Sequence, residues 1–255
     1  MRVLVAGATG VVGNQLVPLL VNTGHEVIAT TRGPEKFDAL RGQGAEPIAL
    51  DLLDADAVRA AVTKARPDAI VHQATALSAL GNNFRNPDKL FRATNQLRTR
   101  GTENLLAAAQ AAGTDRFIAQ SFCGWPFAAE GSLVKDEGAP LETNPPTTIV
   151  GTLAAIKRLE QLVLRTPGAV ALRYGGLYGP GTSLDTGGPQ FKAMTKRQIP
   201  IVGDGAGYWS FLHVHDAATA ALAALTRGEG IYNIVDDEPA AARDWIPYLA
   251  EVLGA

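Results

Sequence analysis

The sequence feature that most constrains the fold is a run of three glycines between a short apolar segment and a helical pattern. Gly7, Gly10 and Gly13 have Gly-x-x-Gly-x-x-Gly spacing and directly follow Val3-Leu4-Val5-Ala6. Glycine lets the backbone turn tightly and approach a pyrophosphate, and a helix N-terminus presents N–H groups and a positive dipole end. The pattern therefore predicts a dinucleotide-binding βαβ unit. Its expected phosphate-contacting residues are Gly7, Thr9, Gly10, Val11, Val12 and Gly13.

The rest of the chain alternates short β-branched segments with longer Ala/Leu-rich segments of helical period. This pattern predicts a Rossmann-like α/β fold, a doubly wound parallel sheet with a small loop-rich C-terminal lobe. Strands are expected at 2–6, 26–30, 46–50, 69–73, 116–120, 170–172, 199–202, 209–214 and 231–235. Helices are expected at 12–22, 34–41, 54–65, 87–111, 149–165, 217–225 and 241–253, with Gly24 as a C-cap and Asp54 as an N-cap. We expect one domain over 1–255, with 1–172 mainly the dinucleotide-binding core and 173–255 mainly the substrate-side lobe.

Composition excludes several classes of function. The 23 basic and 25 acidic residues nearly balance and form no long run, so a nucleic-acid partner is not expected. Cys123 is the single cysteine, which excludes an intrachain disulfide framework and fits a reducing cytoplasm. Apolar runs are too short for a membrane span. His213 and His215 would share a strand face, but no third ligand accompanies them, so no metal site is expected.

The residues after the second expected strand bear on the choice of nucleotide. An acidic side chain about twenty residues past the glycines would accept hydrogen bonds from the ribose of NAD. This chain has Thr31-Arg32 there, so a guanidinium replaces the carboxylate and could pair with a 2′-phosphate. The sequence therefore favours NADP over NAD.

Further segments resemble the extended short-chain dehydrogenase/reductase family, in its NAD-dependent epimerase/dehydratase group. The resemblance rests on the glycine turn, Asp51-Leu52, 72–76, Asn95 with 101–106, 172–181, 211–216 and 231–234. It implies that Asp51 and Leu52 contact the adenine and that Ala74, Thr75 and Ala76 lie along the cofactor. It also implies that the segment containing Tyr174 and Gly175 closes over the nicotinamide. Members of this family often form homodimers, and most continue several tens of residues past Ala255, where they wall the substrate pocket.

The resemblance also marks departures in the catalytic residues. The family's Tyr-x-x-x-Lys pair corresponds to Leu153-Ala154-Ala155-Ile156-Lys157, so the lysine is present and the tyrosine is not. Phe122 stands where a catalytic hydroxyl is expected, with Ser121 one position before it. The expected catalytic residues are Lys157, Ser121, Asn95 and Tyr174, with Lys157 holding the nicotinamide ribose and Tyr174 as a replacement acid. Trp125, Pro126 and Phe127 could wall an apolar substrate.

Together these features predict an atypical NADP(H)-binding short-chain oxidoreductase that acts on a small carbonyl compound or alcohol. Two alternatives remain open. The same pocket could perform a non-redox isomerisation, cyclisation or dehydration, or the chain could be a non-enzymatic NADP-binding regulator. Loss of the tyrosine favours both alternatives, whereas Lys157 and the aromatic residues near Trp125 favour an enzyme.

Overall fold

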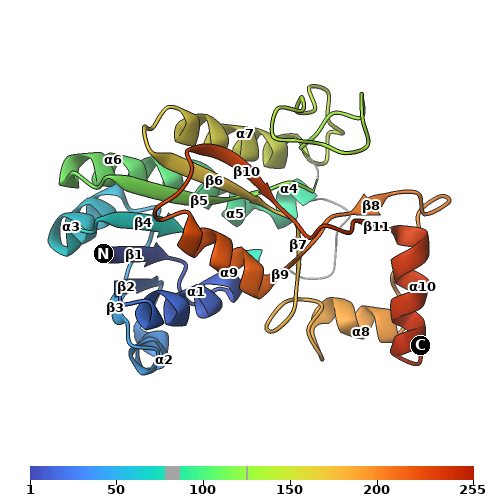
Figure 1. The fold of residues 1–255 in the computed structure, drawn as a ribbon, viewed down its shortest axis with the longest axis horizontal. Helices are drawn as coiled ribbons and strands as arrows, with labels where there is room; N and C mark the ends of the chain where they lie inside the picture. Colours follow the sequence, from blue (N-terminus) through green and yellow to red (C-terminus); the bar gives the residue numbers. More distant parts are fainter. Residues whose placement is uncertain (78–86, 125) are drawn as a thin grey trace.

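A computed structural model describes residues 1–77, 87–124 and 126–255 of the chain. Its centre is a parallel sheet of seven strands in the order β10-β6-β5-β4-β1-β2-β3 (Figure 1). The strand order reverses between β1 and β4, which is the doubly wound topology of a Rossmann-like fold. The predicted fold class is confirmed. The strands of this sheet are β1 (Arg2–Ala6), β2 (Glu26–Thr31), β3 (Glu46–Ala49), β4 (Ala69–His72), β5 (Arg116–Phe122), β6 (Ala169–Tyr174) and β10 (Gly230–Ile234).

Helices cover both faces of the sheet, as Figure 1 shows. On one face, α1 (Val11–Asn22), α2 (Phe37–Gly42) and α9 (Val214–Ala223) bury an apolar cluster against the strands. On the other face, α3 (Ala55–Ala65), α6 (Thr102–Ala112) and α7 (Val150–Leu164) bury a second cluster. Buried parallel strands need apolar cover on both sides, which explains their nearly continuous Val, Ile, Leu and Ala content.

Caps mark several helix ends that the sequence predicts. Asp54 accepts hydrogen bonds from the backbone N–H groups of Asp56 and Ala57 at 3.1 and 3.0 Å, and so caps α3. Gly24, with φ +83°, follows the last turn of α1, where a left-handed residue lets the chain leave the helix. These signals were readable because a cap depends on a few neighbouring residues only.

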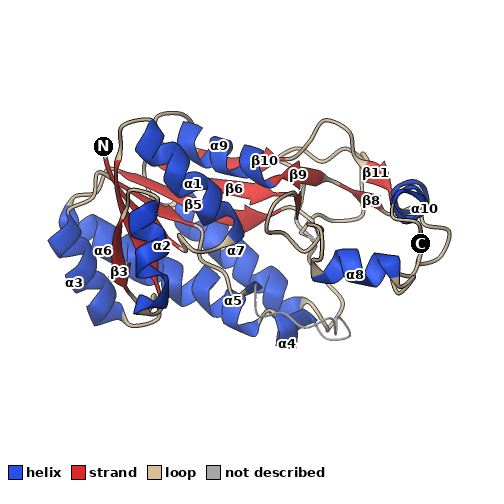
Figure 2. Cartoon of the chain, turned by 90° about the horizontal axis from the view of Figure 1, so that it is seen from below, coloured by secondary structure: helices blue, strands red, loops and turns tan. Residues whose placement is uncertain are grey.

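Smaller elements form a lobe beyond the main sheet, on the right of Figure 1 and Figure 2. They are β7 (Gly176–Tyr178), α8 (Pro189–Thr195), β8 (Tyr208–Trp209), β9 (Phe211–His213), β11 (Ala240–Ala241) and α10 (Ala242–Val252). Trp209, Phe211 and Trp245 pack against one another with ring centroids 5.4 to 6.0 Å apart. The C-terminal third is divided between this lobe and the main sheet, because β10 and α9 belong to the sheet and its cover.

Four expectations about local structure are wrong. Residues 199–202 form no strand, and Pro200 has no N–H to donate to a ladder. The expected strand 209–214 is split, because β8 pairs with β11 whereas β9 pairs with β7. The expected helix 87–111 is divided into α4 (Pro87–Leu90), α5 (Arg92–Gln96), the π-helical turn η3 (Leu97–Gly101) and α6. Helix α8 lies in a region where no helix was expected. Of these errors, the split of 209–214 depends on strand partners that the local sequence does not specify.

Candidate functional site: a nucleotide cradle at the carboxyl edge of the sheet

The glycine turn between β1 and α1 is built around two close backbone approaches. Gly7 has φ +88°, and a Cβ atom there would lie 2.6 Å from the Cα of Ala74. A Cβ at Gly13 would lie 2.3 Å from the carbonyl oxygen of Gly7. No side chain fits at either position, because the neighbouring atoms are backbone. The turn is therefore held in a shape that only glycine permits.

Helix α1 begins at this turn without a side-chain cap in the described part of the chain. Its N-cap residue is Gly10, which is exposed, and a Cβ there would approach only the Gly7 carbonyl, at 3.2 Å. Thr9 and Val11 are half-buried and Val12 is buried. The first N–H groups of α1 have no side-chain acceptor among the described residues, and Gly10 leaves room in front of them. These N–H groups form a cradle that fits a pyrophosphate. The residues present therefore suit a dinucleotide.

The carboxyl ends of β2 and β3 carry the residues expected around the adenosine part. Thr31 is buried at the end of β2, and Arg32 is exposed with no carboxylate paired to it among the described residues. Asp51 is exposed, and its Oδ1 accepts a hydrogen bond from the N–H of Leu53 at 2.9 Å. Leu52 is buried, and its carbonyl accepts a hydrogen bond from Asn104 at 2.8 Å. The exposed guanidinium and carboxylate are available to a ligand at this edge.

The segment after β4 is held against the turn by a buried histidine. His72 Nε2 donates to the Leu97 carbonyl at 3.2 Å, and its Nδ1 accepts from the N–H of Ala74 at 3.4 Å. Burial lowers the pKa of His72 to about 4, although the bond to Leu97 acts in the opposite direction. Ala74, Thr75 and Ala76 are half-buried, beside the Gly7 turn. The neutral imidazole thus joins this segment to η3.

Two of the expected catalytic hydroxyls lie inside the protein. Ser121 is 1% exposed and donates to Oε1 of Glu160 at 2.7 Å. Tyr174 is 1% exposed, donates to the Ala217 carbonyl at 3.0 Å and accepts from Gln73 at 3.2 Å. Burial raises the pKa of the Tyr174 phenol. Tyr174 is therefore a core residue under α9 rather than the accessible acid that the sequence implied. The Ser121 hydroxyl is occupied by its hydrogen bond to the Glu160 carboxylate.

Lys157 and Asn95 lie on two neighbouring helices. Lys157, on α7, is half-buried and donates from Nζ to the Glu142 carbonyl. Asn95, on α5, donates to Thr152 Oγ1 at 3.1 Å. Gly175 directly follows β6, and a Cβ there would lie 2.4 Å from the Ser210 carbonyl oxygen. The structure brings Asn95 to α7, whereas Lys157 contacts the loop before that helix.

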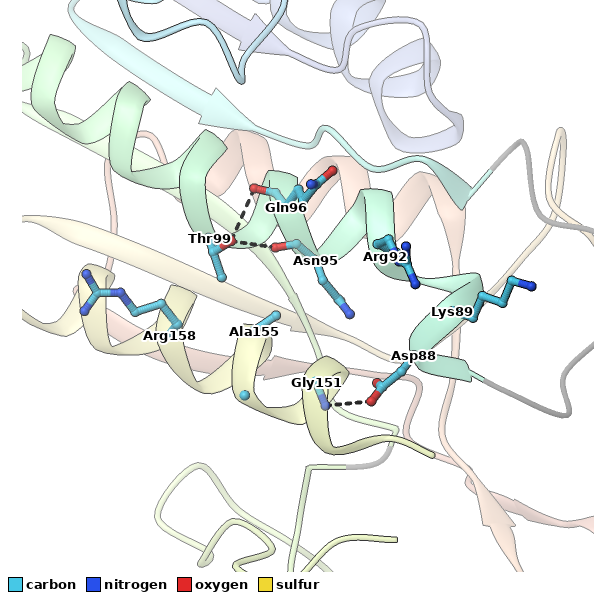
Figure 3. A pocket seen from close by; sticks show the side chains of 10 residues that line it. Asp88, Lys89, Arg92, Asn95, Gln96, Thr99, Gly151, Ala155 and Arg158 are labelled. Atoms are coloured by element: carbon cyan, nitrogen blue, oxygen red, sulfur yellow. Dashed lines mark hydrogen bonds between the residues drawn. The ribbon is translucent and has the colours of Figure 1, made fainter. Parts of the chain in front are cut away.

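A groove of about 710 Å³ separates α4 and α5 from α7 (Figure 3). Asp88 crosses it from α4, and its carboxylate accepts from the N–H groups of Gly151 and Thr152 at 2.8 and 2.7 Å and from the Thr152 hydroxyl at 2.7 Å. Partial burial acts to raise the pKa of Asp88, but these hydrogen bonds outweigh it and keep the pKa below its ordinary value. Asp88 therefore caps α7 from a distant part of the chain.

Sequence reasoning missed a buried ion pair that joins α7 to β6. Arg173 Nε and Nη2 donate to the two carboxylate oxygens of Glu160 at 2.7 and 2.8 Å, and both residues are under 4% exposed. Arg98 is also buried. Two signals were available in the sequence. Arg173 is a charged residue within an apolar strand, and Glu160 is a charged residue on the apolar face of a helix. The Phe127 ring lies over Arg173, with its centroid 5.2 Å from the guanidinium carbon Cζ. Trp125 lies outside the described residues.

Comparison with known proteins identifies the family. The family model described as "NAD dependent epimerase/dehydratase family" matches residues 3–235. The chain belongs to this family. Its members include enzymes that act on small molecules, in agreement with the nucleotide cradle found at β1 and α1. Within the residues that the structure describes, none of the helices combines the length and apolar character that a membrane span requires.

Several relatives are reductases. A 3-diazoavenalumate denitrifying reductase from a Streptomyces species is 44% identical over the whole chain and 82% of the relative. A 4-hydroxy-2-methyl-3-oxo-4-farnesyl-3,4-dihydroquinoline-1-oxide ketoreductase from Stigmatella aurantiaca is 30% identical over the whole chain and 74% of that protein. Among solved structures, the UDP-glucose 4-epimerase of Thermus thermophilus in complex with NAD is 26% identical, with a TM-score of 0.74. That match covers all of this chain and 84% of the epimerase. These similarities support an oxidoreductase-like enzyme.

Proposed function

We propose that this chain is an NADP(H)-dependent reductase of a small electrophilic compound. The observation that carries the proposal is the cradle at β1 and α1, where Gly7 and Gly13 exclude any side chain and α1 starts without a cap. A reductase relative that is 44% identical over the whole chain supports the redox class. The nucleotide would lie along the carboxyl edge of the sheet, where ligands of doubly wound folds bind.

The proposed preference for NADP rests on Arg32. Its exposed guanidinium follows β2. Neither residue 31 nor residue 32 is acidic, so neither could accept hydrogen bonds from a free 2′-hydroxyl as a carboxylate would. A guanidinium pairs with a phosphate through charge-assisted hydrogen bonds. We therefore expect NADPH to bind more tightly than NADH.

The proposal assigns a separate role to each residue that the sequence analysis expected at the site. When bound, reduced nicotinamide supplies a hydride. Lys157 would donate to the ribose hydroxyls in place of the Glu142 carbonyl that it now contacts. Asn95 would support α7 through Thr152, together with Asp88. Ser121 and Tyr174 would stay in the protein interior, because both hydroxyls already have buried partners.

The absence of a tyrosine from α7 bears on the substrate. Helix α7 reads VGTLAAIKRLEQLVL, so no phenol lies one turn from Lys157 to protonate a developing alkoxide. A carbonyl substrate would take its proton from water. A diazo compound that reacts as its diazonium form is a second candidate. Hydride replaces the cationic N2 group, which departs as N2 and leaves a neutral C–H product, so the protein needs no acid. The 44% identity to a denitrifying reductase of a diazo compound favours this second candidate.

The first experiment is a fluorescence titration of the chain with NADPH and with NADH. Wild type is compared with Arg32→Ala, Lys157→Ala and the control Arg41→Ala, an exposed arginine paired with Asp38. We expect Arg32→Ala to weaken NADPH binding about tenfold and leave NADH binding unchanged, since a charge-assisted phosphate contact contributes roughly 1.5 kcal/mol. Lys157→Ala should weaken both nucleotides. Failure of both nucleotides to bind wild type would overturn the proposal.

A second experiment distinguishes the reaction classes. NADPH oxidation is followed with a panel of small ketones and aldehydes and with a hydroxyaryl diazonium salt, each corrected for the rate without protein. NADPH oxidation with a carbonyl compound or with the diazonium salt supports the proposed reductase. Tight nucleotide binding without any oxidation would instead favour the non-redox isomerase, cyclase or dehydratase, or the regulator.

A further inference from the structure

The described part of the chain buries one more positive than negative charge at the carboxyl edge of the sheet. Its buried charged side chains are Arg98, Glu160 and Arg173, at 7%, 3% and 2% exposure. His72 is buried nearby, but burial lowers its pKa to about 4, so it is neutral at neutral pH. Buried charges are costly unless they are paired, so an excess of one guanidinium is unusual.

Glu160 balances Arg173 rather than Arg98. Its two oxygens accept from Nε and Nη2 of Arg173, and Oε1 also accepts from Ser121. Among the described residues Arg98 makes one long hydrogen bond, from Nη1 to Oδ1 of Asn95 at 3.4 Å. Burial lowers the pKa of Arg98 to about 10, with attraction to Glu160 opposing the change, so Arg98 is protonated at neutral pH. Arg173 Nη1 is also buried without an acceptor among the described residues.

Hydrogen bonds and strand pairing link this cluster to the nucleotide cradle. Arg98 is the second residue of η3, and the carbonyl of the preceding Leu97 accepts from His72. His72 in turn accepts from Ala74, which lies against Gly7. On the other side, Arg173 is the register partner of Ser121 near the carboxyl ends of β6 and β5. A nucleotide whose pyrophosphate lies at Gly10 would extend along this same edge, towards the cluster.

We propose that the excess charge of the Arg98–Glu160–Arg173 cluster makes the site prefer reduced over oxidised nicotinamide, an inference that rests on the proposed function. The oxidised ring carries a positive charge and the reduced ring is neutral. A fixed, poorly solvated positive charge raises the free energy of the cationic form alone. The adenosine, phosphate and ribose groups are the same in both forms, so their contributions cancel in the ratio of the two dissociation constants. The cluster thereby favours binding of the reduced nucleotide and release of the oxidised one, at the expense of making the bound nicotinamide a weaker hydride donor.

The test measures dissociation constants for NADPH and NADP+ by calorimetry at pH 7.5. Wild type is compared with Arg98→Gln, which leaves Glu160 paired with Arg173. Arg98→Lys keeps the charge, and Arg100→Gln removes an exposed charge two residues along the same turn. The preference for NADPH should fall several-fold in Arg98→Gln, because removing a fixed positive charge lessens the penalty on the cationic ring. It should stay at the wild-type ratio in the other two variants.

The outcomes separate this inference from the proposed function. If wild type binds neither nucleotide, the proposed function fails. If it binds both, but Arg98→Gln keeps the wild-type ratio or changes it no more than Arg100→Gln, the inference alone is overturned. Circular dichroism establishes that each variant is folded. Should Arg98→Gln not fold, Glu160→Gln provides the opposite test, because removing the carboxylate should increase the preference for NADPH, and an unchanged or reduced preference overturns the inference.

Discussion

Acidification should destabilise this protein through one buried imidazole, His72. Its pKa in the folded protein is about 4, below the ordinary value of 6.5, because the ring is buried and neutral between Leu97 and Ala74. Between these two values the unfolded chain binds a proton that the folded chain excludes. The stability that His72 contributes is therefore complete above pH 6.5 and is lost as the pH falls towards 4.

The size of this effect follows from the difference between the two pKa values. At about 1.4 kcal/mol per pH unit, the change from 6.5 to about 4 corresponds to a loss of about 3 kcal/mol. That is a large part of the roughly 5 to 15 kcal/mol by which a typical domain is stable. Because Asp88 has a pKa below its ordinary carboxyl value, its own contribution is lost at lower pH than this window.

The assay is urea unfolding of wild type and His72→Gln at intervals between pH 7.5 and pH 4. His72→Gln should be less stable at pH 7.5 by about 1 to 2 kcal/mol, because hydrogen bonds are lost. Its free energy of unfolding should then decline less with acid, so that the two curves cross between about pH 6 and 5 and His72→Gln is the more stable at pH 4. The exposed His215→Gln is the matched control and should follow wild type. Parallel curves for wild type and His72→Gln would refute the argument that His72 is held neutral.

Three further substitutions test other parts of the structure. Gly7→Ala should abolish NADPH binding in fluorescence titrations, because the new methyl group would lie 2.6 Å from Ala74 Cα, whereas Gly42→Ala, in open space, should bind normally. Asp88→Ala should lower the free energy of unfolding in urea by about 1 to 2 kcal/mol, since it removes the cap of α7; an unchanged value would contradict the capping role. Tyr174→Phe should cost about 1 to 2 kcal/mol in the same assay, through the bonds to Ala217 and Gln73, without changing kcat. A large fall in kcat would return Tyr174 to the catalytic residues.

Local patterns were enough to predict the doubly wound sheet and the cradle. The Gly7 to Gly13 spacing, the Asp54 cap and the Gly24 helix end each depend on a few adjacent residues, and all have the expected geometry. The central strands were also predictable from local sequence, because short β-branched segments alternate with amphipathic helical segments along the chain. Local propensity and burial agree in these segments, so periodicity is informative there.

Hydroxyl groups are harder to assign from sequence. Ser121 and Tyr174 are close to the carboxyl ends of β5 and β6, where functional residues gather, yet both side chains are enclosed. Whether a side chain at a strand end faces solvent or a packed helix depends on what covers that face of the sheet. For Ser121 the deciding neighbour is Glu160 on α7, and for Tyr174 it is Ala217 on α9.

The sequence by itself determined the fold class, the nucleotide turn and the position of Arg32, because these depend on short-range spacing and on residue chemistry. Only the tertiary structure decided that Arg98, Glu160 and Arg173 share one buried cluster and that Asp88 caps a helix more than sixty residues away. The physical reason is that electrostatic and capping interactions act between atoms close in space. Spacing along the chain carries no information about which distant segments the fold brings together.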